Sequence, residues 1–270
     1  MKFQIKYIAA VITAATLFMS CSNDDNSTIA EGTTGDAELY FDNGVAGDAL
    51  ILGDTYTNSN GEALTINRLS YIISNLVLIK EDGTEFVYPK EESYFVISQE
   101  AGLFTVHLEN VEAGDYKKVR FGLGVDKQRY LQGETAQQSF WDLAAQNNLT
   151  WTWSTGYKFI NFEGTFGNDA KPFQVHQGSN TATDNYREIT LNLPTTARVR
   201  ENEQPSIHIK TDVNVLLDGD IKIKLQDNLN GACTAAGIMG GQNLIDIAAN
   251  SLKMFEVDHV HNGAGSHHEE

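Results

Sequence analysis

The sequence predicts an all-β fold, an antiparallel β-sandwich with one or two short helices. Apolar and polar residues alternate in several short stretches, which is the period of a half-buried strand. Turn-forming residues separate these stretches, as in the segments 81–83, 113–115 and 218–220. Only two stretches carry apolar residues at helical spacing, and no internal repeat is present. We therefore expect one β-rich domain in this chain of 270 residues.

Three stretches show the strand period most clearly. Apolar residues occupy every second position in 119–125 and 189–193 and most second positions in 207–215. The two helical stretches are 136–147 and 242–252. Their apolar faces consist of Phe140, Leu143 and Ala144 in the first, and of Leu244, Ile247, Ala248 and Leu252 in the second.

The amino terminus has the form of a bacterial export signal. Lys2 and Lys6 precede an apolar run that is too short to cross a bilayer, and Ser20 stands directly before Cys21. The segment 17–21, Leu-Phe-Met-Ser-Cys, resembles a lipobox, which implies cleavage after residue 20 and lipidation of Cys21. Two or more acyl chains hold a protein durably at a membrane.

These features divide the chain into four parts. We expect a lipoprotein signal peptide at 1–20, a flexible acidic tether at 21–36, a sandwich domain at 37–262 and a polar, His-containing tail at 263–270. The acidic residues behind Cys21 resemble the surface-export signals of Bacteroidetes lipoproteins. The expected location is the outer membrane, on the cell surface or on the periplasmic face.

The charge and the cysteines limit the partners. The formal net charge of −17 argues against binding to nucleic acid or to anionic membrane surfaces and favours cations. Cys233 has no partner for a disulfide once Cys21 is lipidated, and we expect it to be a small buried residue, with a metal-binding thiol as the alternative. The chain carries no G-x-S-x-G, P-loop, H-E-x-x-H or zinc-spaced cysteines, so the motifs give no argument for a hydrolase.

The segment 151–164, Trp-Thr-Trp-Ser-Thr-Gly-Tyr-Lys-Phe-Ile-Asn-Phe-Glu-Gly, is unusually rich in aromatic residues. By chemistry alone, these rings would most often fill the sandwich core. The segment resembles the W-x-W-x-x-G-Y-x-F-x-x-x-E-G signature of the MbnP-like copper-binding family. Four further segments resemble that family in the same order along the chain, and they are 69–76, 121–126, 173–178 and 255–262.

This resemblance implies a copper-binding protein that is not an enzyme. One Trp of the pair Trp151 and Trp153 would be oxidised to kynurenine by a di-haem partner protein of the MauG type. The kynurenine and two His side chains would then hold one Cu(I). Imidazole nitrogens suit copper, whereas the indole nitrogen of an unmodified Trp is only a hydrogen-bond donor.

The ligand candidates among the histidines follow from this resemblance and from spacing. His176 matches the family's F-x-x-H-x-G and lies on the polar face of a strand in which Phe173 and Val175 point inward. His259 and His261 share one side of an extended segment and could chelate a metal. Many family members carry a His just after a Phe in the first strand, and here Phe41 is followed by Asp and Asn.

Two further functions remain open at this stage. A surface sandwich could bind glycan or another envelope polymer through exposed aromatic rings, with Trp141, Trp151 and Trp153 as stacking platforms. A Ca²⁺-stabilised adhesion module is weaker, because the sequence offers no Asp-x-Asp-x-Asp loop. Burial of the Trp151 segment beside His176 would favour copper binding over glycan binding.

Overall fold

The computed structural model describes residues 29–152, 156–180 and 182–263. The predictions for the signal peptide, Cys21, the start of the tether, Trp153 and residues 264–270 therefore lie outside the described residues. Within the described part, no helix is long and apolar enough to span a lipid bilayer.

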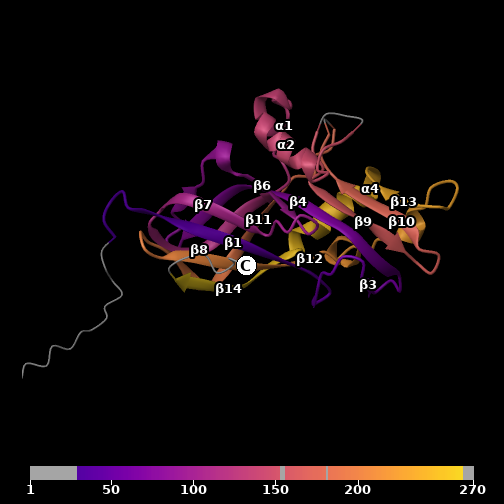
Figure 1. Cartoon of the computed structure of the whole chain (residues 1–270), viewed down its shortest axis with the longest axis horizontal. Helices are drawn as coiled ribbons and strands as arrows, with labels where there is room; N and C mark the ends of the chain where they lie inside the picture. The colour runs from indigo at the N-terminus through magenta and orange to yellow at the C-terminus, as the bar shows by residue number, and fades with distance from the viewer. Residues whose placement is uncertain (1–28, 153–155, 181, 264–270) are drawn as a thin grey trace, which may run out of the picture.

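The described chain forms two β-sheets that share one core, which confirms the predicted sandwich (Figure 1). In the smaller sheet, β14, β12, β1 and β2 follow one another, and β7 also pairs with β1. The strands of this five-stranded sheet are β1 (Thr34–Val45), β2 (Asp48–Ala49), β7 (Thr105–Glu112), β12 (Gln204–Asp212) and β14 (Phe255–Gly263).

The larger sheet is organised around one long strand. Its strands follow one another in the order β11, β8, β4, β9, β10 and β13. Strand β4 also pairs with the short strands β3, β5 and β6. The bounds are β3 (Thr55–Thr57), β4 (Ala63–Lys80), β5 (Glu85–Val87), β6 (Tyr94–Ser98), β8 (Gly114–Leu123), β9 (Ile160–Phe166), β10 (Lys171–Gln177), β11 (Arg187–Val199) and β13 (Ala236–Ile238).

Most strand pairs are antiparallel, as predicted, but two are parallel. These are the pair of β1 with β12 and the pair of β10 with β13. Each joins strands that are distant in the sequence, since a parallel pair needs a long connection. The alternation of apolar residues along one strand does not specify the direction of its neighbour.

The main core fills the space between the sheets. Residues at alternate positions of the facing strands are fully buried there, among them Phe41, Phe121 and Ile207. Burial of a large apolar side chain stabilises the fold by about 1.5 to 3 kcal/mol. The period-two residues of the predicted strands at 119–125 and 207–215 supply much of this core, which explains why the sequence pattern located them.

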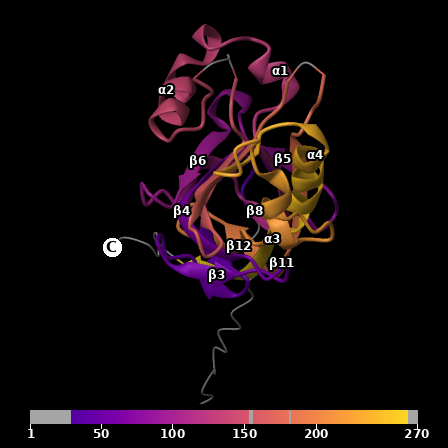
Figure 2. The same ribbon diagram turned by 90° about the vertical axis from the view of Figure 1, so that its right-hand side faces the viewer.

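The described residues also form four α-helices and four 3₁₀ helices. Figure 2 shows the α-helices beside the sheets. The predicted helices at 136–147 and 242–252 are confirmed as α2 and α4. The bounds are α1 (Lys127–Tyr130), α2 (Gln138–Gln146), α3 (Val215–Asp218), α4 (Gly241–Asn250), η1 (Lys90–Glu92), η2 (Thr135–Gln137), η3 (Leu225–Asn228) and η4 (Ser251–Lys253).

A second, smaller core lies on the outer face of the nine-stranded sheet. Phe140 of α2 packs there with Ile72 of β4, Val96 of β6 and Phe159. Strand β4 is therefore buried on both faces at this point, which accounts for its continuous run of buried residues from Leu69 to Ser74. This second core also contains Leu149 and Tyr157, which lie on either side of Trp151 in the sequence.

One expectation about local structure was wrong. Cys233 is exposed, not buried, because it lies in a turn with a φ of 57° and its N–H donates to the Asn230 carbonyl. The three predicted turn segments are all described: 81–83 contains Gly83 with a φ of 87°, Ala113 lies between β7 and β8, and the chain bends at Gly219 and Asp220. Gly114 begins β8 in extended conformation.

Candidate metal centre

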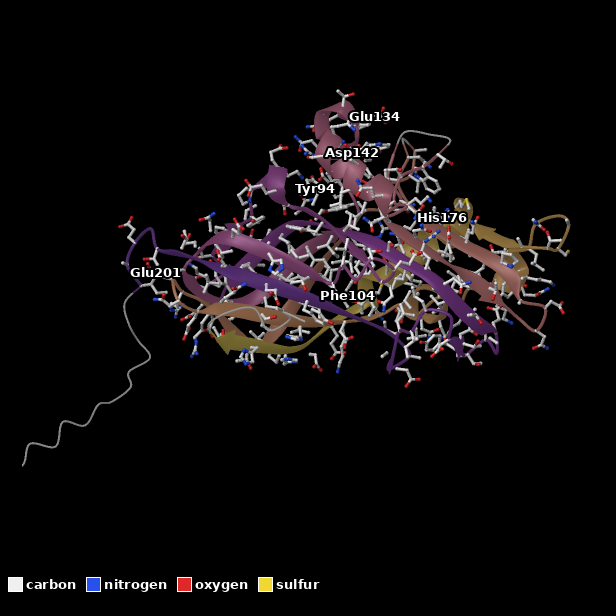
Figure 3. All side chains as sticks on the ribbon, viewed as in Figure 1. Tyr94, Phe104, Glu134, Asp142, His176 and Glu201 are labelled. Carbon is white, nitrogen blue, oxygen red and sulfur yellow. The ribbon has the colours of Figure 1, made fainter. Side chains whose placement is uncertain are left out.

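His176 lies in β10 and is buried on the side of the sheet that faces away from the main core. Its neighbours Phe173 and Val175 point into the main core and are fully buried, as the alternation predicted. His176 is itself only 5% exposed. Figure 3 shows it near the strands β9 and β10, on the side where α1 and α2 project. A histidine on this face is buried because the segment that carries Trp151 covers it.

A carboxylate holds the imidazole of His176. The Nε2 atom of His176 lies 2.6 Å from Oε1 of Glu163, and Oε2 of Glu163 lies 2.6 Å from Nη1 of Arg68. His176 pairs with Asn161 across β9 and β10, so Glu163 occupies a diagonal position on the same face. Arg68 of β4 is the direct partner of Glu163 on its other side. The sheet register therefore places His176, Glu163 and Arg68 in a row across three strands.

The hydrogen-bond donors around Glu163 determine how this row of side chains is protonated. An ionised carboxylate only accepts hydrogen bonds, so the Nε2–H of His176 donates to Glu163. In a neutral imidazole this leaves the lone pair on Nδ1, the arrangement by which carboxylates orient metal-binding histidines. The hydrogen bond from His176 lowers the pKa of Glu163 more than burial raises it, with Arg68 and Lys158 acting in the same direction as His176.

Trp151 packs directly against His176. The two ring centres are 5.7 Å apart and the planes meet at 63°. The indole Nε1–H of Trp151 donates to the carbonyl oxygen of Tyr157 at 3.2 Å, and the backbone N–H of Trp151 donates to Gly156. A Cβ at Gly178 would lie 2.6 Å from the Tyr157 oxygen and 3.3 Å from Cζ2 of Trp151. Glycine is thus required where the sequence has H-x-G.

Lys158 brings an amine close to the same indole. Its Nζ atom lies 5.6 Å from the ring centre of Trp151. Burial lowers the pKa of Lys158, while the charge of Glu163 opposes this effect and that of Arg68 adds to it. The indole therefore lies close to both an imidazole and an ammonium group.

The other predicted ligands lie elsewhere in the fold. His259 and His261 belong to β14, an edge strand of the five-stranded sheet, where they pair with His208 and Ser206 of β12. His176 belongs to the other sheet. The structure thus brings His176 together with Trp151 but places the pair His259 and His261 on a separate surface.

The donors around His176 fit a copper site in part. They provide one buried imidazole, oriented by a carboxylate and next to a Trp whose unmodified indole has no lone pair to offer. Within residues 29–152, 156–180 and 182–263, no three His, Cys, Asp or Glu side chains converge so that they could hold a metal ion. Near Phe41, where the resemblance led us to look for a second His, Asn43 accepts a hydrogen bond from Tyr71 and donates one to Gln99.

Sequence reasoning missed the residues that support His176. In the sequence, Glu163 and Lys158 are only two letters of the W-x-W segment, and no motif points to Arg68. The strand period indicates that Glu163 and His176 face the sides opposite to Phe162 and Val175. It does not show that β9 and β10 are neighbours in this register.

Comparison with known proteins places the chain in a family. The family model described as MbnP matches residues 34–236. A search of solved structures found MbnP from Methylosinus trichosporium, which is 12% identical, with a TM-score of 0.47 over 86% of this chain and 99% of that chain. A search of curated proteins found no match. The family match spans well over half of the chain, which therefore belongs to the MbnP family.

Proposed function

We propose that this chain is an extracytoplasmic copper-binding lipoprotein without enzymatic activity. It is anchored to the outer membrane by a lipid at Cys21 and holds one Cu(I) per chain beside His176. Family membership supports the copper, and the lipobox-like segment 17–21 supports the anchor.

The contact between His176 and Trp151 supports this proposal beyond the family match. His176 and Trp151, the two motif residues that the resemblance implies as neighbours at the metal, are in contact although 24 positions separate them in the sequence. Glu163 holds Nε2 of His176, so Nδ1 is the nitrogen that would bind the metal. His176 is also shielded from water, and a preorganised, shielded site suits a soft cation.

Kynurenine formation supplies what the unmodified residues lack. Oxidation of Trp151 or Trp153 by a di-haem partner would replace an indole that only donates with an aromatic amine that has a lone pair. The second imidazole of the site would come from residues not in contact with His176 here. His259 and His261 remain candidates only through a rearrangement, because they lie in the other sheet.

The experiment compares two sources of the protein. Protein from a heterologous host without the di-haem partner should contain unmodified Trp and bind Cu(I) weakly. Protein co-expressed with that partner should be heavier in the peptide that contains Trp151 and Trp153 and should bind one copper per chain. Mass spectrometry and metal analysis measure both quantities. Intact Trp at both positions and copper at background in the co-expressed protein would refute the proposal.

The glycan-binding alternative receives less support. Trp141 packs edge-on against Tyr157 with 5.1 Å between ring centres, and Trp151 packs against His176. Both indoles are half-buried, which reduces the flat surface that a sugar ring could stack on.

A further inference from the structure

The outer face of the five-stranded sheet carries four histidines. Along each long strand of this sheet, every second side chain points into the main core, as Leu39, Ile207 and Val260 do. The side chains between them lie on the outer face. The outward positions of β7, β12 and β14 hold His107, His208, His259 and His261.

Two of these histidines form a stacked pair. His208 and His259 are direct partners across β12 and β14. Their ring centres are 4.0 Å apart and their planes differ by 21°. Directly opposite residues of antiparallel strands have Cβ atoms about 5 Å apart, so the two imidazoles can reach one cation if they turn out of the stack and point one ring nitrogen each toward it. On the β1 side, Tyr40 lies 5.4 Å from His208 and limits where that ring can move.

A neighbouring carboxylate orients one ring of the pair. The Nδ1 atom of His259 lies 2.8 Å from Oδ2 of Asp258, and Nζ of Lys210 lies 2.6 Å from the other oxygen of Asp258. Since the carboxylate accepts, Nδ1–H of His259 donates, and the lone pair of the neutral ring is on Nε2. A carboxylate behind a histidine is the usual support of a metal ligand.

An unusual buried carboxylate lies next to the pair. Glu38 is diagonal to His208 across β1 and β12 and is fully buried, although its side chain is on the outer face. Its Oε1 accepts a hydrogen bond from Ser206 at 3.0 Å. Its Oε2 has no hydrogen-bond partner within the described part of the chain and lies 3.5 Å from Nδ1 of His107. Burial of a carboxylate is costly without a nearby positive charge.

We propose that His208 and His259 bind one divalent transition-metal cation on this face, with His261 as a third ligand. The site is separate from the one at His176 and lies in the other sheet. His261 is exposed on the same side of β14 and must turn toward the pair, because no three such side chains of the described residues converge as they stand. Exposed side chains change rotamer within nanoseconds. The buried carboxyl group of Glu38, whose Oε2 has no hydrogen-bond partner among the described residues, favours a cation nearby.

The donor set determines the class of ion. Imidazole nitrogens suit Zn²⁺, Cu²⁺ and Ni²⁺, whereas Mg²⁺ and Ca²⁺ prefer oxygen ligands. Zn²⁺ is the appropriate probe, because it has no redox chemistry that would modify Trp or Cys residues.

Calorimetric titration of Zn²⁺ into untagged, chelator-treated protein tests this site. The protein is made without the di-haem partner. The result for Zn²⁺ therefore does not depend on whether the proposed copper site beside His176 exists. We expect one Zn²⁺ per chain at this site, and we expect His208→Ala and His259→Ala each to weaken its binding at least tenfold. Asp258→Asn retains both rings and should weaken binding by about tenfold.

The variant His176→Ala is the matched control and should bind Zn²⁺ as tightly as the unchanged protein. Anomalous diffraction at the zinc edge should place the ion about 2.1 Å from one ring nitrogen each of His208 and His259. Unchanged Zn²⁺ affinity in the double variant of His208 and His259, or a zinc peak at another position alone, would overturn the proposal. Unchanged affinity in that double variant would also identify binding by other histidines of the chain.

Discussion

The Nε2 atom of His176 donates a hydrogen bond to Glu163 across 2.6 Å, from one strand to the next. Glu163 in turn pairs with Arg68 on a third strand. The three side chains therefore form a row across β10, β9 and β4 that no single segment of the sequence contains. Because the row fixes the tautomer and the direction of the imidazole, its members can be tested separately.

Replacing His176 by Ala should lower the affinity for Cu(I) sharply in protein that carries the modified Trp. The change removes a metal ligand but leaves Glu163 paired with Arg68, so the fold should persist. A competition assay with a cuprous chelator measures the affinity, and circular dichroism checks the fold. Retention of unchanged copper affinity by a folded variant would contradict the assignment of His176.

Replacing Glu163 by Gln should lower copper affinity by about 10- to 100-fold, because Glu163 orients His176. Glu163 is a positioning residue, so nitrogen NMR shifts of the His176 ring should also change as the preference for one tautomer weakens. Glu100→Gln is the matched control, since Glu100 pairs with the same Arg68. That variant should keep both the affinity and the NMR shifts. An unaltered tautomer in Glu163→Gln would show that Glu163 does not orient the ring.

Asp126→Asn should lower the free energy of unfolding by about 2 kcal/mol at neutral pH. Burial alone would raise the pKa of Asp126, but hydrogen bonds from Lys90, Tyr94 and Asn75 outweigh it and lower the pKa from 3.8 to about 2. The folded state therefore holds its proton less tightly than the unfolded state does. This stabilisation is complete above about pH 4 and is lost as the pH falls toward about 2.

Denaturant unfolding at several pH values measures this effect. Between pH 4 and pH 2, the stability of Asp126→Asn should depend less on pH than that of the unchanged protein. Asp115→Asn serves as the control, because Asp115 forms an ion pair with Arg200 and its side chain is 58% exposed. Such exposed pairs contribute about 0 to 1 kcal/mol. Equal pH dependence in the Asp126 variant and in the unchanged protein would refute the prediction.

Cys21→Ala should move the protein from the membrane fraction to the soluble fraction, because it removes the sulfur that the lipid would occupy. Fractionation followed by immunoblotting measures the distribution. Cys233→Ala is the matched control, since it removes the other cysteine of the chain. It should leave the protein at the membrane. A Cys21→Ala protein that stays membrane-bound after normal processing would exclude lipid anchoring at this residue.

Much of the fold could be predicted from local patterns. The alternation at 119–125 and 207–215 located residues of β8 and β12, and the helical spacing at 136–147 located α2. Such patterns arise because one face of each element must be buried. They do not contain the parallel pair of β1 with β12, since the partner of a strand depends on residues far away in the sequence.

The sequence by itself determined the strand period, the two longest helices and the motif that marks the MbnP family. It also identified His176, Trp151 and the pair of His259 and His261 as candidate ligands. Their arrangement was decided only by the tertiary structure. Strand register placed His176 beside Glu163, whereas β14 paired with β12 and so placed His259 against His208. Hydrogen bonding between distant strands sets this register, and no local pattern of residues encodes it.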